Sequence, residues 1–231
     1  MDKRLKVVSL FSGCGGLDLG FTGGFKFRHY DFSKTNFDIV FANDYDVDAA
    51  RVYLANEKYF TGHSFENGDV RDLLVDNIPD FDVLLAGFPC QPFSNAGNRG
   101  GVSDKSGRGT LFYECERIIN GSIEKGKIPK AFVFENVRGI LTSKMPDGSL
   151  VTDEILGRMS SLGYNVSMKL IKSSDYGVPQ NRSRVIIVGV RNDIPVFDFG
   201  MLDKIVKEYN LPTVSGNSYE LTLGSIFSDI S

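Results

Sequence analysis

The chain has 231 residues, of which 42% are hydrophobic and 24% are charged, and its formal net charge is -3. This length suffices for a full hydrophobic core, and the composition is ordinary for a soluble globular protein of one α/β domain. No stretch approaches the roughly 20 apolar residues of a membrane span, and the short start before the first strand predicts no signal peptide. The slightly negative charge argues against a protein that coats nucleic acid, although it is compatible with a local basic surface.

The three cysteines, Cys14, Cys90 and Cys115, are irregularly spaced and form no CxxC pair. This arrangement disfavours both a disulfide scaffold and a zinc site. We therefore expect a protein of the reducing cytoplasm, with no bound metal and with its thiols free.

Apolar runs and turn residues predict a regular alternation of strands and helices in the first part of the chain. In chain order, the predicted elements are a strand at 6–11, a glycine-rich turn at 12–16, a short helix at 17–21, a strand at 37–42, a helix at 46–56, a weakly signalled strand before Asp69, and a strand at 81–88. The helix at 46–56 begins with an aspartate cap.

The second part of the chain predicts a strand at 131–136 and two late strands at 166–171 and 184–190, which form a hairpin around 177–179. Strands that alternate with helices predict an α/β fold with a doubly wound, mostly parallel sheet that ends in this antiparallel hairpin. Periodicity is lost from Asn192 onward, so we expect residues 192–231 to be irregular.

Three strand ends carry residues suited to a nucleoside. Gly13, Cys14, Gly15 and Gly16 follow the first strand, where glycines allow a ligand close to backbone N–H groups, although a tight turn alone also requires glycine. Asn43-Asp44-Tyr45 ends the second predicted strand, where an acidic residue commonly binds ribose hydroxyls. Asp44 has an alternative interpretation as a helix cap, a role for which Asp46 competes. Gly68-Asp69-Val70 ends the third strand, at the usual place for contact with an adenine edge.

The spacing of the glycines bears on which cofactor would bind. The turn lacks the GxGxxG pattern expected for a dinucleotide pyrophosphate. S-adenosylmethionine has no phosphate, so a shorter glycine turn is sufficient. The pattern therefore favours this methyl donor over a nicotinamide, and an NAD-dependent enzyme is the less favoured alternative.

The segment Gly87-Phe88-Pro89-Cys90-Gln91-Pro92-Phe93-Ser94 follows a buried apolar strand. Open α/β sheets place their ligands at the carboxyl ends of the strands, and two prolines stiffen the segment. This is how a nucleophilic thiol would be presented, although a single cysteine is also often a small buried hydrophobe.

A carboxylate and two arginines complete the candidate chemistry. Glu135 closes the strand expected beside that of Cys90, where a carboxylate can exchange a proton. Arg182 and Arg184 have alternate spacing at a strand start, so their side chains would point the same way. The alternative for the arginines is a solvated surface pair.

Several segments resemble the DNA cytosine carbon-5 methyltransferases, in the same order along the chain. Residues 9–17 look like the family's cofactor motif, with serine where aspartate is common, and residues 87–94 look like its catalytic Pro-Cys motif. Arg108-Gly109-Thr110-Leu111-Phe112, Glu135-Asn136-Val137 and Gln180-Asn181-Arg182-Ser183-Arg184 match later motifs. Asp44 stands where the family usually has glutamate. The related tRNA methyltransferases are the nearest alternative, but the sequence around Cys90 looks more like the DNA enzymes.

The resemblance implies a Rossmann-like S-adenosylmethionine-dependent methyltransferase fold and a set of roles. Cys90 would attack carbon 6 of a flipped cytosine, Glu135 would bind ring nitrogen 3 and the exocyclic amine, and Arg184, with Arg182, would contact the base carbonyl. The implied cofactor-binding residues are Phe11, Ser12, Gly13, Cys14, Gly15, Gly16, Leu17, Asn43, Asp44, Tyr45, Asp69, Val70, Gly87, Pro89 and Leu111. The implied DNA-binding residues are Gln91, Ser94, Arg99, Lys105 and Arg108. Residues 95–107 are expected to form a lid over DNA.

The resemblance covers roughly residues 6–191, which implies a catalytic domain at residues 1–191, and it does not extend to a target recognition domain. We therefore expect residues 192–231 to lead toward a recognition domain that these 231 residues lack. The chain would then be a subunit of a split methyltransferase or a truncated product, acting on double-stranded DNA with a complementing polypeptide. The alternative from another class is a fragment that binds donor or DNA without turnover.

Overall fold

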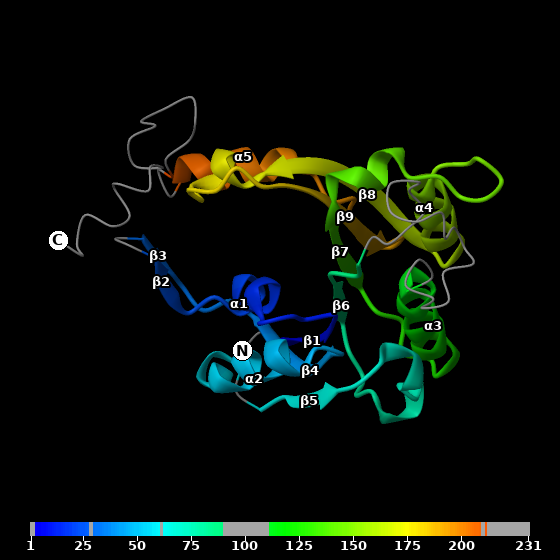
Figure 1. Ribbon diagram of the computed structural model, residues 1–231, viewed down its shortest axis with the longest axis horizontal. Helices are drawn as coiled ribbons and strands as arrows, with labels where there is room; N and C mark the ends of the chain where they lie inside the picture. The colour runs from blue at the N-terminus through cyan, green and yellow to red at the C-terminus, as the bar shows by residue number, and fades with distance from the viewer. Residues whose placement is uncertain (1–2, 28–29, 61, 90–110, 209–210, 212–231) are drawn as a thin grey trace.

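In a computed structural model of the chain, the described residues are 3–27, 30–60, 62–89, 111–208 and 211. They form a seven-stranded sheet of order β5-β4-β1-β6-β7-β9-β8 (Figure 1). The strands are β1 (Leu5–Leu10), β4 (Phe37–Asp44), β5 (Ser64–Asn67), β6 (Val83–Ala86), β7 (Ala131–Val137), β8 (Tyr164–Lys172) and β9 (Ser183–Arg191).

The sheet is parallel from β5 to β7, and β9 is antiparallel to both β7 and β8. The prediction of a mostly parallel doubly wound sheet with a late antiparallel hairpin is therefore confirmed. Right-handed crossovers between parallel strands place helices on both faces of such a sheet. The carboxyl ends of β1, β4, β5, β6 and β7 consequently meet at one edge.

Helices α3 (Leu111–Glu124) and α4 (Val151–Ser161) cover one face of the sheet, and α1 (Gly16–Thr22) and α2 (Val47–Ala55) cover the other (Figure 1). The alternation of side chains along β1 shows the two faces: Val8 packs in the cluster under α3 and α4, whereas Val7 packs in the cluster under α1 and α2. Both residues are fully buried. Continuous apolar strands are expected where both faces of a sheet are covered.

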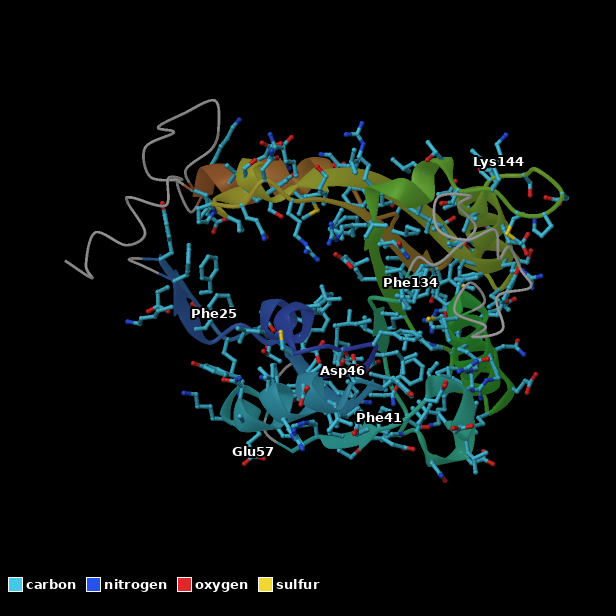
Figure 2. All side chains as sticks on the ribbon, in the orientation of Figure 1. Phe25, Phe41, Asp46, Glu57, Phe134 and Lys144 are labelled. Atoms are coloured by element: carbon cyan, nitrogen blue, oxygen red, sulfur yellow. The ribbon has the colours of Figure 1, made fainter. Side chains whose placement is uncertain are left out.

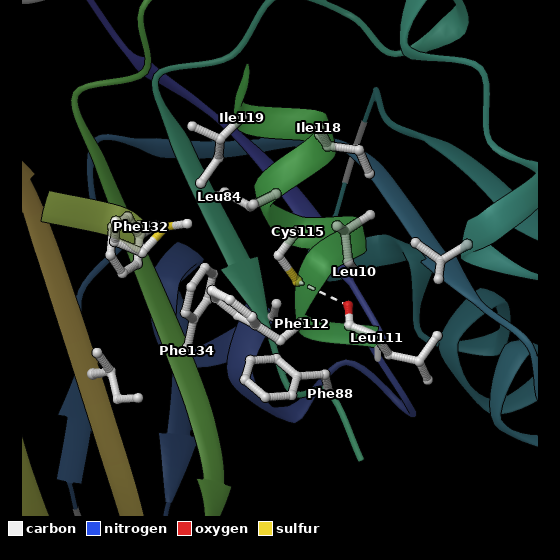
Figure 3. Close-up of a cluster of buried hydrophobic side chains, with 14 of the residues drawn as sticks. Leu10, Leu84, Phe88, Leu111, Phe112, Cys115, Ile118, Ile119, Phe132 and Phe134 are labelled. Atoms are coloured by element: carbon white, nitrogen blue, oxygen red, sulfur yellow. Dashed lines mark hydrogen bonds between the residues drawn. The ribbon is translucent and has the colours of Figure 1, made fainter. Parts of the chain in front are cut away.

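The core beneath α3 contains an aromatic cluster formed by Phe88, Phe112 and Phe134, whose ring centroids lie 5.7–6.2 Å apart. Figure 3 shows these rings beside Cys115, and Figure 2 shows Phe134 among the interior side chains of β7. Cys115 is fully buried, and burial raises the pKa of its thiol far above the ordinary value. This cysteine is therefore a packing residue, in contrast to the exposed Cys14.

Several elements were not predicted from the sequence. They are the small antiparallel pair β2 (Phe25–Phe27) and β3 (Tyr30–Phe32), helices α3 and α4, and the single turns η1 (Glu57–Tyr59), η2 (Val70–Asp72), η3 (Val75–Asn77), η5 (Arg138–Thr142) and η6 (Ser173–Tyr176). In α3, the buried residues Leu111, Cys115, Ile118 and Ser122 recur at helical spacing, a signal that was available in the sequence.

The expectation that residues 192–231 are irregular needs one correction. Helix α5 (Gly200–Glu208) lies within this segment, alongside β8 and β9 (Figure 1). Its apolar residues Leu202 and Val206 are four apart, which is a weak but sufficient amphipathic signal. Upstream of α5, the Ser167 hydroxyl of β8 donates to the Phe197 carbonyl at 3.3 Å, which holds the lead-in segment against the sheet.

Two absences hold for the described part of the chain. Its helices include none that is long and apolar enough to cross a membrane. The same residues contain no group of three or more His, Cys, Asp or Glu side chains placed to hold a metal ion.

Gly189 of β9 offers a test of the sheet packing. It pairs directly with Phe132 of β7, and a Cβ added at Gly189 would lie 2.1 Å from that ring. Because Phe132 is fully buried and cannot move away freely, we expect Gly189→Ala to lower the free energy of unfolding by about 1–3 kcal/mol or more. Urea denaturation measures this loss.

The matched control is Gly157→Ala in α4, where a Cβ would meet nothing within 4 Å. There the better helix propensity of alanine should stabilise the protein by about 0.5–1 kcal/mol. Equal stability of the two variants would contradict the proposed packing of β9 on Phe132.

Candidate active site

A cavity of about 520 Å³ lies at the carboxyl ends of β1, β4, β5 and β6. This is the edge at which parallel sheets bind ligands. The residues that line it are Phe11, Asn43, Asp44, Tyr45, Asp46, Gly68, Asp69, Val70, Arg71, Gly87, Pro89 and Leu111.

Most of the residues predicted to bind a cofactor are brought together here. Those that do not line the cavity are Ser12, Gly13, Cys14, Gly15, Gly16 and Leu17, which form the turn after Phe11 and the start of α1. Three lining residues, Asp46, Gly68 and Arg71, were not among the predicted contacts. Each lies next to a predicted residue in the sequence, which is the signal that could have included them.

The turn after β1 has an unusual backbone conformation at its first residue. Phe11 has a φ of 54°, in the left-handed region that favours glycine. The Ser12 N–H donates to the Asn43 carbonyl at 3.0 Å, and the Gly13 N–H donates to Asp44 Oδ2 at 2.6 Å. These bonds join the turn to the end of β4, so the two walls of the cavity are fixed to each other.

The structure shows which of the two aspartates, Asp44 or Asp46, caps helix α2. Asp46 caps α2, because its carboxylate accepts from the N–H groups of Asp48 and Ala49 at 2.9 and 2.8 Å. The Asp44 carboxylate instead accepts from the N–H groups of Gly13 and Asp46. Each carboxylate oxygen has a second acceptor position, so Asp44 can still accept hydrogen bonds from a ligand in the cavity.

Asn43 and Asp69 hold the end of β5 and the turn after it, which also contribute to the cavity lining. The fully buried Asn43 amide donates to the carbonyls of Glu66 and Gly68, both at 2.9 Å, and so joins β4 to β5. Asp69 caps the η2 turn and forms an ion pair with the Arg71 guanidinium. This hydrogen-bonded ion pair lowers the pKa of Asp69 below its usual range, so its carboxylate is ionised at neutral pH.

Glu135 lies beside this cavity, in contact with both predicted arginines. Its Oε1 is 2.7 Å from Arg184 Nε and 3.8 Å from Arg182 Nη2. The Arg184 Nε is buried and makes an ion pair here rather than an aligned hydrogen bond. A Cβ added at Gly87 would be 3.8 Å from Glu135 Oε2, so Glu135 adjoins the cavity wall at the end of β6.

The register of the sheet explains this contact. Val137 of β7 pairs with Arg184 of the antiparallel β9, and Glu135 pairs with Ile186. Directly paired residues point to the same face, and so do residues two apart in a strand. Arg184 therefore lies on the same face as Glu135, and Arg182, which immediately precedes β9, also reaches Glu135.

Asn136, which the sequence analysis did not single out as a site residue, joins the two halves of the site. It is 2% exposed, and its amide donates to the Phe88 carbonyl at 3.1 Å. Phe88 immediately precedes Pro89 and Cys90, so this bond fixes the segment leading to the cysteine against β7. A buried asparagine at the end of an apolar strand is the sequence signal for such a bond.

The remaining predicted residues lie outside the described part of the chain. They are Cys90, Gln91, Ser94, Arg99, Lys105 and Arg108, together with the proposed lid at 95–107.

Comparison with known proteins identifies the family. The model of the C-5 cytosine-specific DNA methylase family matches residues 5–230, and the chain belongs to this family. Among curated relatives, the Type II methyltransferase M.BanI of Aneurinibacillus aneurinilyticus is 35% identical over 226 residues, which cover 98% of this chain and 46% of M.BanI. The Type II methyltransferase M.NgoBI of Neisseria gonorrhoeae is 40% identical over 194 residues, covering 83% and 52% respectively. The chain spans about half the length of the curated relatives it matches.

Solved structures show the same methyltransferase fold. A putative DNA modification methyltransferase encoded within an E. coli prophage has a TM-score of 0.62 at 25% identity, over 91% of this chain and 51% of that one. The S. pombe Dnmt2 methyltransferase has a TM-score of 0.64 at 21% identity, over 90% of this chain and 55% of that one. The Rossmann-like S-adenosylmethionine-dependent methyltransferase fold expected from the sequence is thereby confirmed.

The Asn136 bond generates a stability prediction. Asn136→Ala leaves the Phe88 carbonyl without its partner in a buried position, so we expect the free energy of unfolding to fall by about 1–3 kcal/mol. Asn120→Ala is the control, because among the described residues that amide bonds only Glu124 at the helix surface, and the change should alter stability by less than about 0.5 kcal/mol. If chemical denaturation gave the same small change for both variants, the role of Asn136 would be disproved.

Proposed function

We propose that this chain is the catalytic portion of a DNA (cytosine-5-)-methyltransferase of the restriction-modification type. It would transfer a methyl group from S-adenosylmethionine to carbon 5 of a cytosine flipped out of double-stranded DNA. The observation that carries the proposal is the contact of Glu135 with Arg184, next to the cavity wall that leads into Cys90. Relatives named as Type II methyltransferases favour DNA over tRNA as the substrate.

The charge of the cavity supports S-adenosylmethionine as the donor. Its volume of about 520 Å³ is within the roughly 300–1,000 Å³ of small-molecule sites. Asp44, Asp46 and Asp69 line it, and Arg71, the one arginine among the described lining residues, is paired with Asp69. Such a lining suits a sulfonium cation with ribose hydroxyls, and it would repel the pyrophosphate of a nicotinamide dinucleotide.

We assign the donor contacts from the position of each lining residue. The Asp44 carboxylate would accept from the ribose hydroxyls, and Asp69 would accept from the adenine amine. Tyr45 is 76% exposed, so its ring is available to stack on adenine. Phe11, Val70 and Leu111 would give the apolar contacts. When bound, the donor supplies a methyl group activated by its positive sulfur.

The chain's own residues would supply the rest of the chemistry. Carbon 5 of cytosine is a poor nucleophile, so the Cys90 thiolate would first form a bond to carbon 6 and raise the electron density at carbon 5. Glu135 would hydrogen-bond ring nitrogen 3 and the exocyclic amine, while Arg184 and Arg182 would contact the base carbonyl. Carbon 5 then takes the methyl group from the donor, and a base removes the carbon 5 proton. The electrons of that C–H bond re-form the double bond between carbons 5 and 6, and the bond to carbon 6 breaks with its electrons returning to the Cys90 sulfur as thiolate.

Base flipping is required because the target atom is unreachable inside a stacked duplex. We propose that Gln91, Ser94, Arg99, Lys105 and Arg108 contact DNA and that residues 95–107 close over it. Residues 1–191 would form the catalytic domain, acting in the cytoplasm. Recognition of a DNA sequence would depend on a complementing polypeptide with the target recognition domain.

The central test is Cys90→Ser in a methylation assay on unmethylated duplex DNA, with and without the complementing polypeptide. We expect wild-type activity only in the complemented reaction, because phosphate contacts from the missing partner supply much of the DNA affinity. Cys90→Ser should abolish methyl transfer and leave donor binding within a few-fold of wild type. A serine variant with substantial activity would remove Cys90 from the nucleophilic role.

The donor assignment is tested by Asp44→Ala. Loss of charge-assisted hydrogen bonds to ribose should weaken S-adenosylmethionine binding by about 1.5–3 kcal/mol in calorimetry. Asp48→Ala is the control, because this aspartate lies in the first turn of α2 but is exposed and pairs only with Arg51 among the described residues. Unchanged affinity in Asp44→Ala would refute the assignment of Asp44 to the donor.

A further inference from the structure

We infer that Asp18 is a positioning residue for the donor, acting through a buried cluster of Ser9, Asp18 and Tyr53 behind the glycine turn. This Asp18 cluster touches neither the cavity nor the proposed reacting atoms. The inference rests on the proposed donor site, because its effect is exerted on the turn that forms one wall of the cavity.

The Asp18 cluster is a complete hydrogen-bonded unit. Ser9, Asp18 and Tyr53 are each at most 1% exposed. The Ser9 hydroxyl donates to Asp18 Oδ1 at 2.6 Å, and the Tyr53 hydroxyl donates to Asp18 Oδ2 at 2.7 Å. Within the described part of the chain, Asp18 has no lysine or arginine as an ion-pair partner. Burial raises the pKa of Asp18, while these two donors oppose that shift.

The bond between Ser9 and Asp18 closes the glycine turn at its base. Ser9 lies in β1 just before the turn, and Asp18 lies in α1 just after it. Between them, Phe11 has its left-handed φ of 54° and Gly15 caps α1 with a φ of 85°. A non-glycine residue in this region persists only where its surroundings hold it there. The cluster supplies such a restraint next to Phe11, which lines the cavity.

Tyr53 packs against the same turn. A Cβ added at Gly15 would lie 3.0 Å from the rings of Tyr53 and Phe60, so the turn rests directly on them. The Tyr53 ring is stacked on Phe60 with centroids 4.7 Å apart, and its hydroxyl is held by Asp18. Tyr53 belongs to α2, whose cap Asp46 also lines the cavity. Asp18 therefore links the glycine turn to α2, two elements that both contribute to the cavity lining.

Burying an acidic side chain at this position is unfavourable in free energy compared with burying an apolar one. An isolated buried carboxyl loses its hydration, and apolar side chains of similar volume often give equal or greater stability. What a carboxyl provides and an apolar group does not is fixed direction, since it binds two hydroxyls from two different elements. The cluster is thus better suited to holding a geometry than to stabilising the core.

The experiment compares donor affinity and thermal stability in three variants of the full chain. Calorimetry with S-adenosylmethionine, and separately with S-adenosylhomocysteine, is done well below each Tm. Asp18→Ala removes both hydroxyl contacts and so releases the turn that carries Phe11, and we expect it to weaken binding about tenfold to a hundredfold. Asp18→Asn and Tyr53→Phe keep the shape of the cluster and should each weaken binding about threefold to tenfold.

The matched control is Ile155→Val in α4, a fully buried residue in the other hydrophobic cluster. It should lower Tm without changing donor affinity. If Asp18 acts only on stability, then Asp18→Asn and Tyr53→Phe will behave like this control, and wild-type affinity in both would overturn the inference. In the complemented enzyme, the KM for the donor should rise while the KM for DNA stays constant. An unchanged donor KM with a lower kcat would also overturn it.

Failure of the proposed function gives a different result. If the wild-type chain binds neither S-adenosylmethionine nor S-adenosylhomocysteine, the donor site itself is wrong, and the inference falls with it. If wild type binds and the variants differ only in Tm, the donor site stands and the positioning role of Asp18 does not. Should Asp18→Ala fail to fold, the two shape-conserving variants still decide between these outcomes.

Discussion

The hydrogen bond from the Asn136 amide to the Phe88 carbonyl sets the relation between the two halves of the site. Phe88 is followed directly by Pro89, which lines the cavity, and Asn136 is preceded directly by Glu135. One buried bond therefore fixes how far the carboxylate lies from the cavity wall. Beneath it, the packed ring of Phe134 prevents the two strand ends from moving apart. A close-packed interior resists small displacements, so the geometry of the site depends on this contact more than on any surface interaction.

Acidic and basic side chains predominate in different parts of the site, although the net charge of the whole chain is small. The cavity at β1, β4 and β5 is lined by Asp44, Asp46 and Asp69 against Arg71. The neighbouring edge at β7 and β9 carries Arg182 and Arg184 around Glu135. A cationic donor and an electron-rich base carbonyl would each meet the opposite charge. The net charge of -3 hides this division, because local fields depend on the arrangement of charges and not on their sum.

The sequence predicted what depends on strand ends and short motifs. Parallel strands bring their carboxyl ends to one edge, so Asp44, Asp69 and Glu135 could be grouped before any coordinates were known. Contacts between elements far apart in the chain were not predicted. The bonds of Asn136 to Phe88 and of Asp18 to Tyr53 arise from the particular packing of helices on the sheet. Residue type alone does not encode such packing, since a buried asparagine or aspartate has many conceivable partners.

The antiparallel direction of β9 has a consequence for the order in which the molecule can fold. The arginines that face Glu135 lie at the start of β9 and just before it, and residues 173–182 join β9 to β8 in an antiparallel hairpin. The donor cavity instead requires β1 to pair with β4 and β6, and β1 lies far from β6 in the sequence. Local hairpins form within microseconds, while pairings of high sequence separation are slow. The β8–β9 hairpin that carries these arginines can therefore form early, whereas the cavity and the contact of the arginines with Glu135 of β7 are completed only when the long-range topology has closed.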